Sequence, residues 1–204
     1  GDSAGPMVAS HMIGDSRGKE VRDTIVVRKR IKGRNVVIIK AKGPGGRLGK
    51  PWEIVEKEVR RGKVAKIISI DAAGKLEGEK TGAIAEGVGV AMGSFYRAFI
   101  ENIATEKRVP IESIAIKMVP EEAIMNMPTD VLKAVPRAVY AVEQNIKNTK
   151  RKGTIIVMGV GNTSGVGNNK KSVEAAEKKA KEIEQMIKRR AEQEKPKGWF
   201  RFGF

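Results

Sequence analysis

Segments typical of strands alternate with segments typical of helices along most of this chain, and that order limits the fold more than any other feature. The strand-like runs are rich in β-branched residues and occupy 23–42 (two runs around a turn), 64–70, 112–118 and 154–160, with a weaker glycine-rich run at 83–93. Helix-like segments occupy 4–13, 51–61, 95–107, two stretches within 120–148 (PEEAIMNM and TDVLKAVPRAVYAVEQNIKN) and 172–193. Alternation of this kind is typical of an α/β fold. We therefore expect a largely parallel sheet covered by helices, with a kink or break at Pro136.

The length of 204 residues favours one domain, which we place at residues 1–194, followed by a basic and aromatic tail, KPKGWFRFGF, at 195–204. Forty Lys and Arg against twenty-four Asp and Glu give a formal net charge of +16. Such an excess favours an anionic partner such as RNA, DNA or an acidic lipid surface. Because acidic residues are interspersed with the basic ones, the ion-paired surface of a thermophilic protein explains the composition equally well.

Several classes of protein are excluded by what the chain lacks. It has no cysteine, which excludes disulfides, thiolate catalysis and cysteine-ligated zinc. No apolar run approaches the roughly 20 residues that span a bilayer. No secretory signal is visible, which favours a cytoplasmic location.

The first residues, GDSAGP, share letters with the segment around the nucleophile of trypsin-like serine proteases. A serine nucleophile needs a general base within hydrogen-bonding reach. The only histidine is His11, which follows Ser3 on the same predicted short helix. The alternation of strands and helices also differs from the many evenly spaced strands of that protease fold. A trypsin-like role for Ser3 is therefore rejected.

Ligands of parallel α/β sheets bind beyond the carboxyl ends of the strands, and three loops are predicted to lie there. They are GPGGRLGK at 43–50, DAAGKLEGEKTG at 71–82 and GNTSGVGNNKK at 161–171. Asp71 comes directly after the buried run 64–70, where a carboxylate is exposed and positioned by rigid backbone. A helix or turn cap is the alternative role for such an aspartate.

The loop GPGGRLGK stands between a strand and a helix, as a phosphate-binding P-loop does, but its letters differ. One residue too many separates Gly43 from Gly49 and Lys50, and Pro51 stands where a metal-binding Ser or Thr belongs. A nucleoside triphosphatase is therefore disfavoured. A looser anion site remains a hypothesis, as does a plain flexible turn with solvated lysines; its candidate residues are Lys42, Arg47, Lys50, Lys170 and Lys171.

Three short motifs carry a resemblance to a known superfamily. GDSAGP near the start, SIDAA at the end of a central strand and TSGVGNNKK before the last helix occur in that order. The same order is similar to that of the spore germination protease and its relatives, whose fold the hydrogenase-maturation proteases share. The whole chain also resembles an archaeal family of unknown function whose members carry the stretches KAKGPGGRLGK and KLEGEKTG.

The resemblance implies a three-layer α/β/α domain, like that of the hydrogenase-maturation proteases, with two carboxylates facing each other across the carboxyl edge of the sheet. Asp2 and Asp71 fall on the two acidic positions. They would act as an aspartate pair on a peptide bond of a protein or peptide substrate. In the hydrogenase proteases the equivalent acids hold nickel together with a histidine, and His11 lies too close to Asp2 in the sequence to fill that role.

Two carboxylates held close together cannot both ionise easily, so one becomes the acid and the other the base toward a water molecule. One divalent metal ion bound by Asp2 and Asp71 is the alternative to this shared proton. The loop after the last strand is expected to supply backbone donors to the developing oxyanion. Its candidate residues are Asn162, Thr163, Ser164, Gly165, Gly167 and Asn168.

The resemblance also predicts a first strand upstream of Gly1, and we expect relatives to carry a hydrophobic segment there that tethers the domain to a membrane. A second hypothesis keeps the fold without the chemistry. In it, the basic surface and the aromatic tail 195–204 dock on an anionic membrane or on RNA.

Overall fold

The computed structural model describes residues 1–89 and 94–194 and contains one seven-stranded sheet. The strands are β1 (Lys19–Val21), β2 (Thr24–Ile31), β3 (Arg34–Ala41), β4 (Val64–Gly74), β5 (Ile84–Val88), β6 (Ile111–Met118) and β7 (Thr154–Gly159). The helices are α1 (Ala4–Ile13), α2 (Pro51–Arg61), α3 (Ser94–Glu106), α4 (Pro120–Ile124), α5 (Thr129–Asn148) and α6 (Lys170–Gln193).

The strand order is β1-β2-β3-β7-β4-β6-β5, and its four central strands, β3, β7, β4 and β6, run parallel. The hairpin of β1 and β2 continues the sheet on one side in antiparallel pairing, and β5 pairs antiparallel with β6 on the other side. Parallel strands need helical crossovers, which explains the alternation along the chain. The predicted α/β fold with a largely parallel sheet is confirmed.

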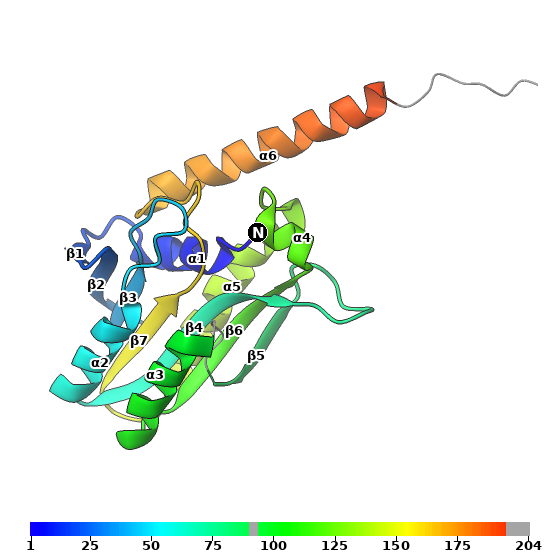
Figure 1. The fold of residues 1–204 in the computed structure, drawn as a ribbon. Coiled ribbons are helices and arrows are strands. Elements are labelled where there is room, and N and C mark those ends of the chain that lie inside the picture. The colour runs from blue at the N-terminus through cyan, green and yellow to red at the C-terminus, as the bar shows by residue number, and fades with distance from the viewer. Residues whose placement is uncertain (90–93, 195–204) are drawn as a thin grey trace, which may run out of the picture.

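Helices cover both faces of the sheet and form three layers (Figure 1). One core cluster joins α1 and α5 to one face, through residues such as Val8, Ile38 and Val135. The other cluster joins α2 and α3 to the opposite face, through residues such as Val55 and Ile100. Helix α6 lies outside α1, with Val173 buried at its start, and its far end extends past the rest of the domain (Figure 1).

Some boundaries differ from those that the sequence predicts. Strand β4 continues to Gly74 instead of ending at residue 70, because β6 pairs with it along that whole length. The two helical segments predicted on either side of Pro128 are α4, which ends at Ile124, and α5, which begins at Thr129, but the break predicted at Pro136 does not occur. Pro136 lies inside α5 with its side chain exposed, and the helix continues through it.

Each of the four central strands has a hydrogen-bonded neighbour on both sides, so the edges of the sheet are β1 and β5. A strand supplied from upstream would therefore have to pair at one of these edges. Residues 90–93 of the predicted run 83–93, and the tail 195–204, lie outside the described residues. Within the described ranges, none of the helices combines the length and the apolarity needed to cross a membrane.

Candidate active site

A step in the carboxyl edge of the sheet leaves Asp71 without a paired strand residue on its β7 side. Strand β7 ends at Gly159, opposite Ile70 of β4, whereas β4 continues beside β6. The backbone N–H of Val160 still donates to the carbonyl oxygen of Ile70, at 2.8 Å. Asp71 is thus the first residue of β4 beyond its β7 neighbour, a position where parallel sheets bind ligands.

Asp71 is buried, with 9% of its surface exposed. Its Oδ1 accepts a hydrogen bond from the backbone N–H of Ala72, at 2.7 Å. Burial raises the pKa of the Asp71 carboxyl to about 8, and the negative charge of Asp2 acts in the same direction, whereas the Ala72 N–H opposes both. At neutral pH Asp71 is therefore mostly protonated.

Asp2 lies near this edge because helix α1 begins in contact with the edge of the sheet. The contact is closest at Gly5, where an added Cβ would lie 2.2 Å from the carbonyl oxygen of Val160 and 2.4 Å from that of Ile70. Gly161 has a φ of +127°, and a Cβ on it would lie 2.1 Å from the carbonyl oxygen of Asp2. The glycines of the first and last motifs therefore allow these two backbones to touch.

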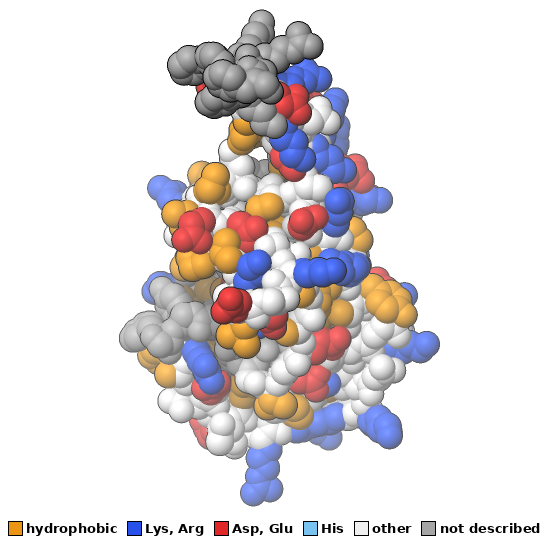
Figure 2. All heavy atoms as spheres, turned by 90° about the vertical axis from the view of Figure 1, so that its right-hand side faces the viewer, with side chains coloured by type: hydrophobic (Ala, Val, Ile, Leu, Met, Phe, Trp, Pro, Cys, Tyr) orange, Lys and Arg blue, Asp and Glu red, His pale blue; other side chains and the backbone are white. Residues whose placement is uncertain are grey.

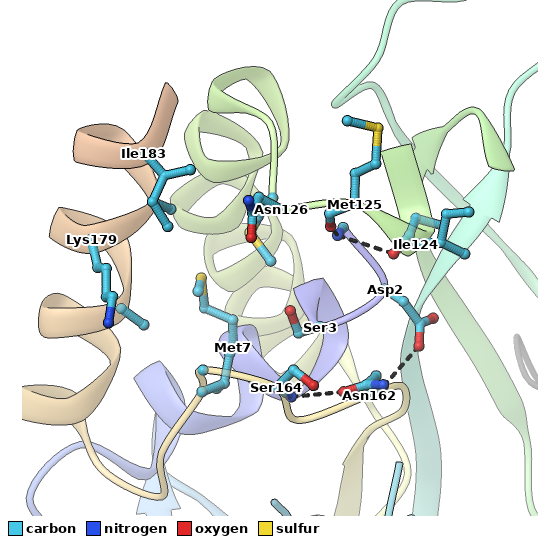
Figure 3. A pocket seen from close by; sticks show the side chains of 17 residues that line it. Asp2, Ser3, Met7, Ile124, Met125, Asn126, Asn162, Ser164, Lys179 and Ile183 are labelled. Atoms are coloured by element: carbon cyan, nitrogen blue, oxygen red, sulfur yellow. Dashed lines mark hydrogen bonds between the residues drawn. The ribbon is translucent and has the colours of Figure 1, made fainter. Parts of the chain in front are cut away.

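The carboxylate of Asp2 is held by the loop after β7. Its Oδ2 accepts a hydrogen bond from the backbone N–H of Asn162 at 2.8 Å (Figure 3). The N–H of Asp2 donates to the carbonyl oxygen of Ala123 at 2.9 Å, which anchors the same residue to α4. By strand alternation Asp71 projects from the α2 and α3 face, whereas Asp2 precedes α1 on the other face. The two carboxyl groups therefore belong to opposite sides of the sheet edge, and the charge of Asp2 still acts on the pKa of Asp71.

A cavity of about 700 Å³ opens beside Asp2, between α6 and the residues around α4 (Figure 3). Its wall is largely apolar, with Met7, Ile124, Met125 and Ile183 among the lining side chains. Asp2 lies at the end away from α6, and Lys179 of α6 lies at the other (Figure 3). Of the two candidate carboxyl groups, Asp2 lines the cavity and Asp71 does not.

The loop 161–169 was predicted to donate backbone hydrogen bonds to an oxyanion, and much of its backbone is already engaged. The N–H of Asn162 binds Asp2, and that of Ser164 binds Asn162 Oδ1 at 2.7 Å. Thr163 donates both its N–H and its hydroxyl group to the carbonyl oxygen of Gly45, each at 3.0 Å. The loop therefore mainly positions Asp2 and fastens the neighbouring loop 43–50.

Lys40, which the sequence reasoning missed, holds the far end of this loop. It is fully buried in β3, and its Nζ donates to the carbonyl oxygen of Ala41 at 2.6 Å and to Oδ1 of Asn168. Burial lowers the pKa of the Lys40 ammonium group to about 8. The sequence does hold a signal: Lys40 continues the inward-facing series of Val36 and Ile38 in an otherwise apolar strand.

The candidate anion-binding lysines pair mostly with glutamates. Lys42 binds Glu20 at 2.8 Å and Lys50 binds Glu53 at 3.1 Å. At the start of α6, Lys170 lies 3.8 Å from Glu174, which supplies the acidic group that a lysine at a helix start requires. Arg47 and Lys171 are exposed. These contacts favour solvated, ion-paired lysines over a preformed anion site.

His11 is engaged away from the edge of the sheet, where its Nε2 lies 2.8 Å from Oε1 of Glu177 on α6. Ser3 lines the cavity, but the one histidine of the sequence is thus committed to a contact between helices. Residues 1–89 and 94–194 contain no group of three His, Cys, Asp or Glu side chains arranged to hold a metal ion. Among these described residues, His11 therefore does not join Asp2 and Asp71 in a three-ligand metal site.

Comparison with known proteins places the chain in a family whose function is not known. No curated protein matches it. The model of the family described as "Domain of unknown function (DUF1512) C-terminal" matches residues 1–167, a range that includes Asp2, Asp71, Lys40 and most of the loop after β7. The chain therefore belongs to the DUF1512 C-terminal domain family.

Proposed function

We propose that this domain hydrolyses peptide bonds with Asp2 and Asp71 acting as a proton-sharing pair. The observation that carries the proposal is the buried Asp71 carboxyl, whose pKa is raised to about 8 beside the charge of Asp2. A protonated and an ionised carboxyl group that reach the same peptide bond supply the acid and the base that attack by water requires. The hydrogen bond from Asn162 to Asp2 supports the assignment of Asp2 as the base, because it stabilises a carboxylate.

In the proposed reaction, the Asp2 carboxylate removes a proton from water as the water oxygen bonds to the carbonyl carbon. Asp71 donates its proton to the carbonyl oxygen, so the tetrahedral intermediate is neutral. Asp2 then passes its new proton to the amide nitrogen while the carbon–nitrogen bond breaks. Asp71 regains its proton when the carbonyl group reforms, and both carboxyl groups return to their starting states.

The cavity beside Asp2 is suited to the residues that flank the scissile bond. Its volume of about 700 Å³ can hold several side chains, and its methionines and isoleucines match apolar ones. Asp2 lies at one end, so a chain bound in the cavity would present its backbone to the carboxyl pair at that end. An unstructured peptide rich in apolar residues is therefore the proposed substrate.

A metal-dependent version of the reaction fits this chain less well. Two carboxyl groups and no third grouped ligand among the described side chains are fewer donors than most catalytic metal sites use. A raised pKa also favours a proton over a metal ion on Asp71. We therefore assign the acid and base roles to Asp2 and Asp71 alone.

We expect the purified chain to cleave some members of a mixture of unstructured peptides, with new termini detected by mass spectrometry. Asp2→Asn and Asp71→Asn should each lower the cleavage rate at least 100-fold, the range expected for a lost acid or base. Asp15→Asn, at an exposed position, is the matched control and should keep the full rate. Ser3→Ala and added EDTA should leave cleavage unchanged.

Two results would refute the proposal. One is the absence of any cleavage by the folded wild-type chain. The other is cleavage that survives Asp71→Asn but is lost in Ser3→Ala or in EDTA.

A further inference from the structure

The connections that enter the four central strands are strongly basic. The basic segments include the adjoining ends of helices and strands: residues 32–34 at the start of β3, 60–63 from the end of α2 to β4, 106–108 from the end of α3 onward and 147–153 from the end of α5 to β7. These four segments, here called the amino-edge loops, contain eleven Lys and Arg and a single acidic residue, Glu106. Their other residues are Gly, Asn and Thr. Most of the excess positive charge of the chain is therefore placed at one edge of the sheet.

Strand order brings these loops together although they are far apart in the sequence. Because β3, β7, β4 and β6 are consecutive neighbours, their amino ends form one row. Direct contacts join the loops: Arg34 donates to the carbonyl oxygens of Thr149 and Arg151, and Arg151 donates to that of Arg108. The N–H of Thr154 donates to the carbonyl oxygen of Lys63 at 2.9 Å, which attaches the loop before β4.

Much of this charge is not neutralised by the protein. Lys32 pairs with Glu143, Arg60 with Glu56 and Lys107 with Glu106. Within the part of the chain that the structure describes, seven more residues of these loops form no ion pair and are exposed on the same edge: Arg61, Lys63, Arg108, Lys147, Lys150, Arg151 and Lys152. Figure 2 shows Lys and Arg side chains projecting at the lower end of the molecule, the end where the parallel strands begin in Figure 1. Holding like charges together disfavours the folded state unless an anion is bound there.

We propose that the amino-edge loops bind the phosphate backbone of double-stranded nucleic acid. Three gaps of about 4.8 Å between four strands make a row about 14 Å long, enough to follow several phosphates of one strand. The loops contain no aromatic residue on which unpaired bases could stack, which disfavours a single strand. Next to them, Val109 is buried and Pro110 is the one exposed apolar residue before β6, which is too little apolar surface to insert among lipids and disfavours a membrane surface. Contacts of this kind position a duplex without reading its sequence.

This surface lies at the opposite edge of the sheet from Asp2 and Asp71, so the inference does not depend on the proposed hydrolysis. Asp71 lies in β4 just past the end of β7, and Asp2 binds the loop after β7, whereas the amino-edge loops lie at the starts of the parallel strands. Nucleic acid could therefore be bound while the cavity beside Asp2 stays open. Failure of either proposal leaves the other standing.

The test is fluorescence anisotropy of the 204-residue chain with 20-base-pair duplexes of RNA and of DNA, at salt concentrations from 50 to 200 mM. About five phosphate contacts predict a plot of log K against log salt with a slope of about −4.5 for DNA. Lys63→Ala, Lys150→Ala and Lys152→Ala together should weaken binding at least tenfold and bring the slope to about −2. Binding of either duplex supports the proposal, and the tighter one identifies the source of the phosphates.

The matched control removes the same charge elsewhere. Lys178→Ala, Lys181→Ala and Lys188→Ala change three lysines of α6, where we expect less than a twofold loss of affinity. Equal weakening by both triple variants would show that only net charge matters and would overturn the proposed site. Absence of duplex binding at 50 mM salt, with or without binding to vesicles containing anionic lipid, would overturn it as well, and circular dichroism confirms that each variant is folded.

Discussion

Asp71→Asn should stabilise the protein at pH 8 and remove most of the loss of stability that we expect between pH 5 and pH 8. In the folded chain the pKa of Asp71 is raised to about 8, mainly by burial, whereas an unfolded aspartate has a pKa of about 3.9. Between these values the folded state binds more protons than the unfolded state, so its stability falls as the pH rises. The slope for one such group is about 1.4 kcal/mol per pH unit. An asparagine carries no charge at any of these pH values and avoids this cost.

Denaturant unfolding at pH 5.5, 6.5, 7.5 and 8.5 measures this effect as the difference between the variant and the wild-type chain. Glu112, whose pKa is lowered, contributes stability above the unfolded pKa of glutamate and is fully ionised throughout this range, so it does not mask the slope. Asp15→Asn serves again as the exposed control and should run parallel to the wild-type chain. If Asp71→Asn also runs parallel to it, the carboxyl group of Asp71 is not buried as described. Gained stability together with lost cleavage would be the signature of a strained functional residue.

Gly5→Ala should be among the most damaging single substitutions in the chain. A methyl group at this position would lie 2.2 Å and 2.4 Å from two carbonyl oxygens of the sheet edge, and neither backbone can move without breaking β4 or β7 pairing. We expect a loss of about 3 kcal/mol or more in the free energy of unfolding, as for severe overpacking of a core. In any fraction that folds, α1 would be displaced, and Asp2 would lose its hydrogen bond from Asn162.

The matched control is Gly62→Ala, because Gly62 has extended backbone and nothing within 4 Å of an added Cβ. We expect a change of less than about 0.5 kcal/mol there, as at most surface sites. Thermal melts and denaturant unfolding at one pH compare the two variants directly. Equal effects of Gly5→Ala and Gly62→Ala would mean that α1 does not rest on the edge of the sheet.

The bounds of helices could be predicted closely where nearby residues, such as a proline at the first helical position, indicate where the helix begins. Helix α1 has the predicted bounds 4–13, and α2 begins at Pro51, where proline suits a first helical turn. Strand β4 continues past Asp71 because it stays paired with β6. The sequence DAAG alone does not predict a strand there. The division at Pro128 could be predicted, whereas the continuation of α5 through Pro136 could not: Val135 and Ala138 beside it are buried in the core, and that packing is not visible in the sequence.

The candidate site divides in the same way. The place of Asp71 at the carboxyl edge could be predicted from its position after the run 64–70, whereas that of Asp2 was implied only by the resemblance of the three motifs. The contact of Lys40 with Asn168 joins residues 128 positions apart and could not be predicted without the strand order. The amino-edge loops were missed for the same reason. Each is a short basic stretch in the sequence, and they form one surface only because β3, β7, β4 and β6 are neighbours in the sheet.

Titration of the Asp71 carboxyl group tests the central claim most directly. Carbon-13 NMR of aspartate side chains, with Asp71→Asn used to assign the signal, follows the protonation of Asp71 from pH 4 to pH 10. The account predicts a pKa near 8 in the wild-type chain and a lower value in Asp2→Asn, because the charge of Asp2 raises the pKa of its neighbour. A pKa near 4, or a value that Asp2→Asn leaves unchanged, would contradict the proton-sharing pair.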